Sequence, residues 1–172
     1  EEKKNKINRQ IKDMIRKEME KRRNAETKTV AKKDLGKISS IIAAYKIKLN
    51  LNISGKIVSR FGKSVNKEFG ISINNDGIEL EKVENELFSP ISGKIIFSDW
   101  LKGKGNVIII SVDERFAAVF ANLSEVYVSK GQEIKKSDLL GKVMADHGGK
   151  NVLYFSTWID GNPFDPELLI MR

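Results

Sequence analysis

The 172-residue chain contains no cysteine, only three prolines and a single histidine. Without cysteine it can form neither a disulfide nor a thiolate metal site. The histidine, His147, lies in a glycine-flanked loop, so a catalytic triad or a histidine-rich zinc site has one candidate residue at most. No apolar run approaches the ~20 residues that a membrane span needs. The chain begins at Glu1 rather than at methionine, and we expect it to be part of a longer protein.

The net charge of +8 is unevenly distributed along the chain. Residues 1–34 carry a net charge of +6, whereas residues 35–172 carry +2. A uniformly basic domain would indicate nucleic acid as a partner, but here the charge belongs to one arm. This arm also lacks the interleaved aromatic residues of a base-stacking surface. The composition therefore disfavours nucleic-acid binding.

An apolar stripe predicts a helix over the first 24 residues. Five residues recur with the spacing of a 3.6-residue period: Ile7, Ile11, Met14, Ile15 and Met19. Charged residues fill the other faces. The stripe fits a helix packed on its own domain, a helix docked on a partner, or the end of a coiled coil. Residues 24–34 lack a period and predict a linker, and residues 35–45 predict a second short helix.

From residue 47 onward the apolar period changes to two, which is typical of strands. Predicted strands cover residues 47–53, 56–61, 69–73, 77–81, 93–99, 106–112, 117–122 and 152–158, with further short strands between residues 128 and 143. Glycine, asparagine, aspartate and proline punctuate them, which favours an antiparallel sandwich or barrel. The turn Gly103-Lys104-Gly105 has no helix after it and so predicts no phosphate site. We expect a mainly β fold with N-terminal helices, divided into an arm (1–45) and a domain (46–172).

The span from about residue 55 to residue 169 resembles the lysostaphin/LytM-type metallopeptidase domain, and its landmarks come in the same order. Asn75-Asp76-Gly77-Ile78-Glu79 lies where that family has His-x-Gly-x-Asp, and Phe120-Ala121-Asn122-Leu123-Ser124 lies where it has Tyr-x-His-Leu-Ser. Val152-Leu153-Tyr154-Phe155 lies where it has His-x-His-Phe, and residues 161–166 resemble its closing Gly-x-Pro-x-Asp-Pro. The resemblance implies a LytM-type β-sandwich, similar to a duplicated barrel-sandwich hybrid, with a helical arm in front.

The departures from this pattern bear on activity. The resemblance implies zinc-ligand positions at Asn75, Glu79 and Tyr154, and positions that assist catalysis at Asn122 and Val152. None of the four histidines that the family has at these positions is present. Asparagine is a poor zinc ligand, and valine can neither ligate nor carry a proton. Without zinc there is no bound water of lowered pKa. We therefore expect no catalytic residue, no metal, no cofactor and no enzymatic activity.

Degenerate domains of this kind resemble the EnvC-like murein hydrolase activators. That resemblance implies a chain that binds a peptidoglycan amidase and relieves its autoinhibition during cell division, in the periplasm or elsewhere at the cell envelope. It also implies a preceding coiled-coil region that connects to a membrane division complex related to ABC transporters. Finally, it implies a helical arm that can cover the binding groove, and residues 1–45 are expected to be that arm.

A cleft that has lost its metal remains concave, and an apolar groove suits an amphipathic helix of a partner. The residues predicted to line this partner-binding groove are Asn75, Phe120, Asn122, Val152, Tyr154 and Trp158. Tyr154 and Trp158 are four residues apart on one predicted strand and should face the same side. Two alternatives remain open: a non-enzymatic module that binds peptidoglycan directly, and an atypical zinc endopeptidase.

Overall fold

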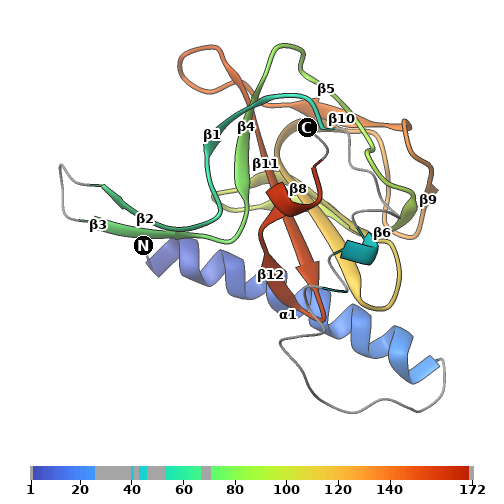
Figure 1. Ribbon diagram of the computed structural model, residues 1–172. Helices are drawn as coiled ribbons and strands as arrows, with labels where there is room; N and C mark the ends of the chain where they lie inside the picture. Colours follow the sequence, from blue (N-terminus) through green and yellow to red (C-terminus); the bar gives the residue numbers. More distant parts are fainter. Residues whose placement is uncertain (1, 26–39, 41–42, 46–52, 67–70, 171–172) are drawn as a thin grey trace.

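The computed structural model describes residues 2–25, 40, 43–45, 53–66 and 71–170 (Figure 1). Within these residues, ten strands form one antiparallel sheet, two strands form a separate hairpin, and a long helix lies across the sheet. The elements are α1 (Glu2–Ala25), β1 (Lys56–Ser59), β2 (Gly62–Asn66), β3 (Ile71–Asn75), β4 (Ile78–Lys82), β5 (Glu86–Phe88), β6 (Gly93–Leu101), β7 (Gly105–Ser111), β8 (Phe116–Val126), β9 (Glu133–Ile134), β10 (Leu139–Val143), β11 (Asn151–Ile159), β12 (Asn162–Phe164) and the 3-10 helix η1 (Pro166–Leu168).

The main sheet has the strand order β1-β4-β11-β8-β7-β6-β9, and β8 is the strand that turns it into two layers. At Asn122 the backbone of β8 takes a φ of 64°, and the pairing register with β7 shifts next to it. Leu123, just after this bend, still pairs with Asn106 of β7, and from Leu123 onward β8 pairs with β10, which in turn pairs with β5. The bend therefore brings β10 and β5 over one face of the sheet.

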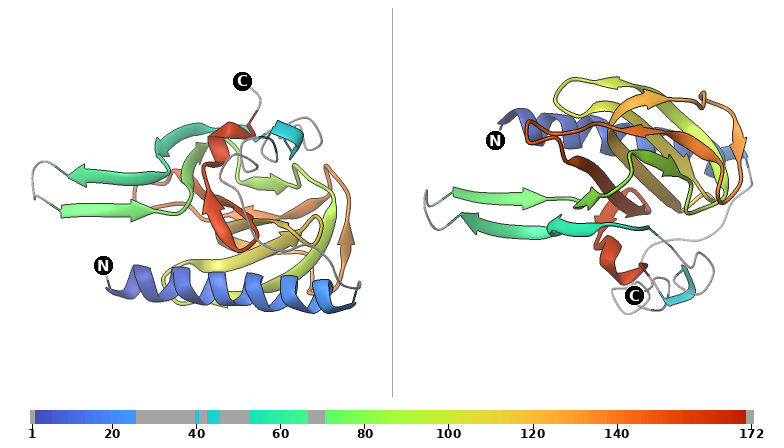
Figure 2. Two further views of the ribbon diagram at one scale, coloured as in Figure 1. Left: turned by 60° about the horizontal axis from the view of Figure 1, so that its bottom comes forward. Right: turned by 90° about the horizontal axis from the view of Figure 1, so that it is seen from above.

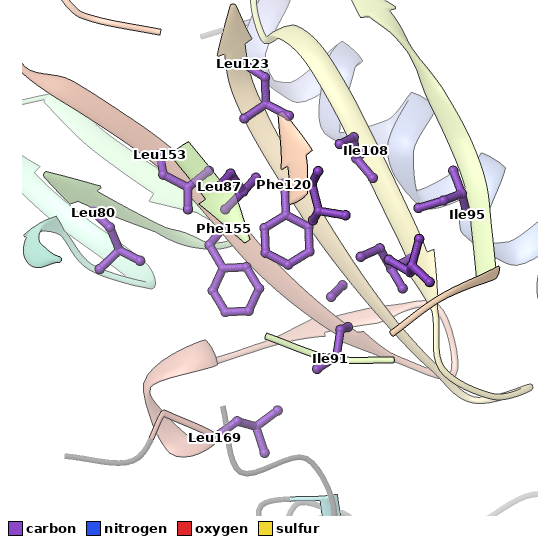
Figure 3. Close-up of a cluster of buried hydrophobic side chains, with 14 of the residues drawn as sticks. Leu80, Leu87, Ile91, Ile95, Ile108, Phe120, Leu123, Leu153, Phe155 and Leu169 are labelled. Carbon is purple, nitrogen blue, oxygen red and sulfur yellow. The ribbon is translucent and has the colours of Figure 1, made fainter. Parts of the chain in front are cut away.

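This covered face, which we call the core face, carries the main hydrophobic cluster (Figure 3). Phe120 of β8 and Phe155 of β11 stack at its centre, with ring centroids 5.1 Å apart. Leu87 of β5 and Leu140 of β10, the two strands over this face, complete the cluster. Tyr45 joins it as well: its ring lies 4.9 Å from that of Phe116. The chain thus returns to the body of the domain just before the predicted boundary at residue 46.

The opposite face of the sheet is covered by α1, and we call it the α1 face. Ile11, Ile15 and Met19 are buried against it, and Met14 packs at the edge of the contact. The sheet residues beneath them are Ile96, Val107, Ile109, Ala117, Val119, Ala121, Tyr154 and Trp158. Figure 2 shows α1 running along this side of the sheet, with residues 43–45 on the other side. Of the roles that the apolar stripe left open, the structure shows a helix packed on its own domain.

The prediction of a mainly β fold with an N-terminal helix is confirmed. The strand predicted over 56–61 ends at Ser59 in the structure. Gly62, which has a positive φ of 94°, begins the next strand β2, which was not predicted. The short strands β5 and β12 were not predicted. Residues 47–52 of the strand predicted over 47–53 and most of the helix predicted over 35–45 lie outside the described residues, and Ile53 belongs to no strand. No helix among the described residues is long and apolar enough to cross a membrane.

Candidate functional site

The neighbouring strands β4 and β11 bring three of the predicted positions, Glu79, Val152 and Tyr154, together on the α1 face. Tyr154 of β11 lies directly across from Glu79 of β4, and on its other side it pairs with Ala121 of β8. Val152 lies two residues from Tyr154 on the same side of β11. Directly paired positions place their Cβ atoms about 5 Å apart. The structure thus places the residues of the three sequence motifs side by side.

Tyr154 is the most buried of these residues, with 5% of its surface exposed. Its ring folds over Gly77: a Cβ atom at residue 77 would lie 3.0 Å from Cζ of Tyr154. Above the ring, the Nζ atom of Lys104 lies 3.5 Å from the centroid. Burial raises the pKa of the Tyr154 phenol, and the nearby carboxylates of Asp76 and Glu79 raise it further, against the opposing effect of a hydrogen bond with Ser156. The phenol is therefore neutral at ordinary pH.

Asn75 acts as a brace of the turn between β3 and β4. Its Nδ2 group donates hydrogen bonds to Oγ of Ser59 (3.1 Å) and to the carbonyl oxygen of Arg60 (3.2 Å). Its Oδ1 atom accepts a hydrogen bond from the backbone N–H of Gly77 (3.3 Å). Since both ends of the amide are used, Asn75 ties β1 to the start of β4.

Asn122 and Val152, the two predicted assisting positions, contact each other directly. The Nδ2 group of Asn122 donates to the carbonyl oxygen of Val152 at 2.6 Å. The backbone of Asn122 is also held on both sides, since its N–H donates to Lys104 O (2.8 Å) and its carbonyl accepts from Met144 N (2.8 Å). Asparagine tolerates the left-handed conformation of the bend better than most residues. Its role in the structure is to fix the bend of β8 against β11.

The expectation that Tyr154 and Trp158 face the same side is confirmed, since both pack under α1. The Trp158 indole N–H donates to Oγ of Ser156 at 3.0 Å, so its polar group is satisfied despite burial. Phe120 does not share this face, and its assignment to the groove is wrong. Side chains alternate along a strand, so Ala121 faces α1 while Phe120 points into the core beside Phe155 (Figure 3).

The zinc ion of the LytM-type peptidases does not fit the side chains present. A tyrosine would have to ligate as the phenolate, whereas Tyr154 is held neutral beneath an ammonium group. The Asn75 amide is already engaged by the protein, which leaves Glu79 as the one carboxylate at a ligand position. Nowhere in the described part of the chain do three histidine, cysteine, aspartate or glutamate residues lie together as a metal cluster. We therefore derive no hydrolytic step for this site.

Two components of the site were not predicted from the sequence. Lys104 belongs to the turn between β6 and β7, and a glycine-flanked lysine in a turn gives no sign that it lies over a tyrosine 50 residues away. The second is the cover that α1 forms. The apolar stripe predicted that α1 packs on something, but the period of a helix does not identify the face that it covers.

The geometry is that of a LytM-type domain, and the sequence agrees with it. The model of the peptidase family M23 matches residues 74–166, which is more than half of the chain, so the chain belongs to this family. This match includes Asn75, Glu79, Asn122, Val152 and Tyr154.

Among curated proteins, the chain is similar to the cell division protein DipM of Caulobacter vibrioides, with 28% identity over 144 residues that cover 78% of this chain and 23% of DipM. The chain spans less than a quarter of the length of the curated relatives it matches. Solved structures with the same fold include a chain of the SpoIIQ–SpoIIIAH pore-forming complex (TM-score 0.60, 18% identity, 70% of this chain and 90% of that chain). Lysostaphin also shares it (TM-score 0.56, 20% identity, 66% of this chain and 49% of that chain).

Proposed function

We propose that this chain is a non-catalytic regulator of a peptidoglycan amidase in cell-wall remodelling during cell division, and that α1 is its resting cover. One observation carries the proposal: Ile11, Ile15 and Met19 of α1 pack on the face where Tyr154 and Glu79 meet. This face has lost the side chains that zinc requires but keeps a large apolar surface. In the proposed active state α1 leaves, and a helix of the amidase takes its place.

The relatives support this role. DipM is a cell division protein, and a structural neighbour was solved in a complex of two different proteins. By analogy, this chain works by binding a protein at the cell envelope, outside the cytoplasm, where peptidoglycan lies. The EnvC-like assignment, with an upstream coiled coil connected to a membrane complex related to ABC transporters, belongs to the same proposal.

The attachment of α1 has the strength of a reversible contact. Each of its buried Ile and Met side chains stabilises the covered state by roughly 1.5–3 kcal/mol before the loss of conformational entropy is counted. The helix also comes close to the domain at Gly161. A Cβ atom at residue 161 would lie only 2.8 Å from Cγ of Arg16. A partner that binds only the uncovered state must overcome this attachment, and its apparent affinity falls by the fraction of uncovered molecules.

The test uses the complete chain and changes only the attachment. Ile15→Asp places a charge under the helix, where it would be buried, and so favours the uncovered state. Gln10→Asp adds the same charge at an exposed position of the same helix and is the matched control. A purified amidase from the same cell is mixed with each variant, and the release of dye from labelled peptidoglycan is followed. We expect Ile15→Asp to stimulate the amidase at least about tenfold more strongly than either the unmodified chain or Gln10→Asp.

The result that contradicts the proposal is equal stimulation, or none, by the three chains. Sedimentation of each chain with purified peptidoglycan distinguishes the binding-module alternative: peptidoglycan binding that Ile15→Asp increases, without amidase stimulation, would favour that module. Stoichiometric zinc in the purified chain, together with hydrolysis of peptidoglycan by the chain alone, would replace the proposal by an atypical endopeptidase.

A further inference from the structure

Lys104 connects two of the degenerate positions although it belongs to neither motif. Its carbonyl oxygen accepts a hydrogen bond from the backbone N–H of Asn122, and its own N–H donates to Leu101 O at 3.0 Å. These bonds fix the turn between β6 and β7 against the bend of β8. From this turn, the Lys104 side chain reaches across to place its Nζ atom 3.5 Å from the ring centroid of Tyr154.

Tyr154 is buried, and its surroundings are rich in negative charge. Glu79 is its direct cross-strand neighbour. Asp76 and Glu79 both lie near enough to raise the pKa of its phenol. The floor beside them consists of apolar side chains that α1 covers. Carboxylates at the edge of such an apolar surface destabilise the folded state unless a cation balances their charge.

We propose that the Lys104 ammonium group is the built-in cation of this degenerate site and takes over the electrostatic role that zinc has in the M23 family. It balances the carboxylates beside Tyr154 and binds the negative face of the tyrosine ring. It also holds the turn between β6 and β7 against β11. The position that ligates metal in active relatives has thus become a stacking surface for a lysine. This inference rests on the site alone and does not depend on the amidase proposal.

The test is a charge series at residue 104 with the same series at Lys102, an exposed lysine of the same turn. Thermal unfolding of the complete chain is measured for each variant. We expect Lys104→Met to lower Tm by about 2–4 °C. Lys104→Glu should lower it further, and Lys104→Arg should stay close to the unmodified chain because arginine keeps both the charge and the stacking. The Met and Glu variants of Lys102 should each change Tm by less than about 2 °C.

Two double variants separate the roles of the ring and of the carboxylate. In a Tyr154→Leu background, Lys104→Met should lower Tm by less than half as much as it does in the unmodified chain, because no aromatic face remains for the ammonium group. In a Lys104→Met background, Glu79→Gln should raise Tm, because it removes a carboxylate that has lost its balancing cation.

Three results would overturn the inference. The first is a Lys104 series that matches the Lys102 series. The second is a cost of Lys104→Met that Tyr154→Leu leaves unchanged. The third is a further loss of Tm on adding Glu79→Gln to Lys104→Met. If Tyr154→Leu fails to fold, the charge series and the Glu79 variant still decide the matter.

Discussion

The two faces of the central sheet are both buried, but they are buried by different means. On the core face, β5 and β10 are joined to the sheet by backbone hydrogen bonds and close over Phe120 and Phe155. On the α1 face, the cover is one helix that attaches through a single stripe of side chains. We therefore expect the core face to open only when the domain unfolds, and the α1 face to open by the departure of one helix.

The side chains on the two faces match this difference. The core face has paired rings: Phe120 stacks on Phe155, and Tyr45 packs in a tilted arrangement against Phe116. Beneath α1, the central strand β8 contributes small residues, Ala117 and Ala121, which let a helix approach closely. Tyr154 and Trp158 border them. The α1 face is thus shaped to receive a helix such as α1.

The largest effect should come from the core face. Phe120→Ala removes a fully buried ring and leaves a cavity beside Phe155. We expect the free energy of unfolding in urea to fall by about 3–5 kcal/mol. The β strands and α1 should lose protection from hydrogen exchange together, because the whole domain is destabilised. Loss of protection in α1 alone would show that the two faces are less distinct than their structures indicate.

The second effect should be confined to one element. In Ile15→Asp, we expect the amide protons of α1 to exchange at nearly the rate of a free helix, while those of β8 and β11 keep at least a hundredfold protection. Native-state hydrogen exchange with mass spectrometry measures both in one experiment. Gln10→Asp serves as the control and should leave α1 protected. If β8 and β11 were exposed together with α1, the cover would be an inseparable part of the core.

Many features of the two faces could be predicted from the sequence, and those that could not were missed for physical reasons. The alternation of strands predicted the sheet, and the spacing of Ile11, Ile15 and Met19 predicted a helix with one buried side. Phe120 was assigned to the wrong face because a buried strand such as β8 is apolar on both faces, and its composition no longer distinguishes them. The cation over Tyr154 depends on a contact between distant strands, which no local pattern encodes.

The third effect concerns pH, because each face holds one buried tyrosine. Burial raises the pKa of Tyr154 on the α1 face, and burial with a hydrogen bond to Asp113 raises that of Tyr45 on the core face. The unfolded chain releases these protons near pH 10 and the folded chain at higher pH. Their contribution to stability is complete below about pH 10 and is lost as the pH rises through the folded values.

Above pH 10, the free energy of unfolding in urea should fall by up to about 1.4 kcal/mol per pH unit for each tyrosine. Tyr154→Phe and Tyr45→Phe should each make the decline shallower, and the double variant should do so most. If Tyr154→Phe left the slope unchanged while Tyr45→Phe reduced it, only the core face would exclude water well enough to hold a phenol neutral.

The smallest effect should come from the outer surface of α1. Arg16 and Glu20 approach to 3.9 Å there, with both side chains more than half exposed. A pair of this kind stabilises a helix by about 0.3–0.5 kcal/mol, so Glu20→Gln should leave the protection of α1 almost unchanged. The cover is attached by apolar side chains, and added salt screens charges without weakening such contacts. Raising sodium chloride from about 0.1 to about 1 M should therefore leave α1 in place. Release of α1 by salt would show that its basic residues, and not the Ile/Met stripe, hold the cover on the sheet.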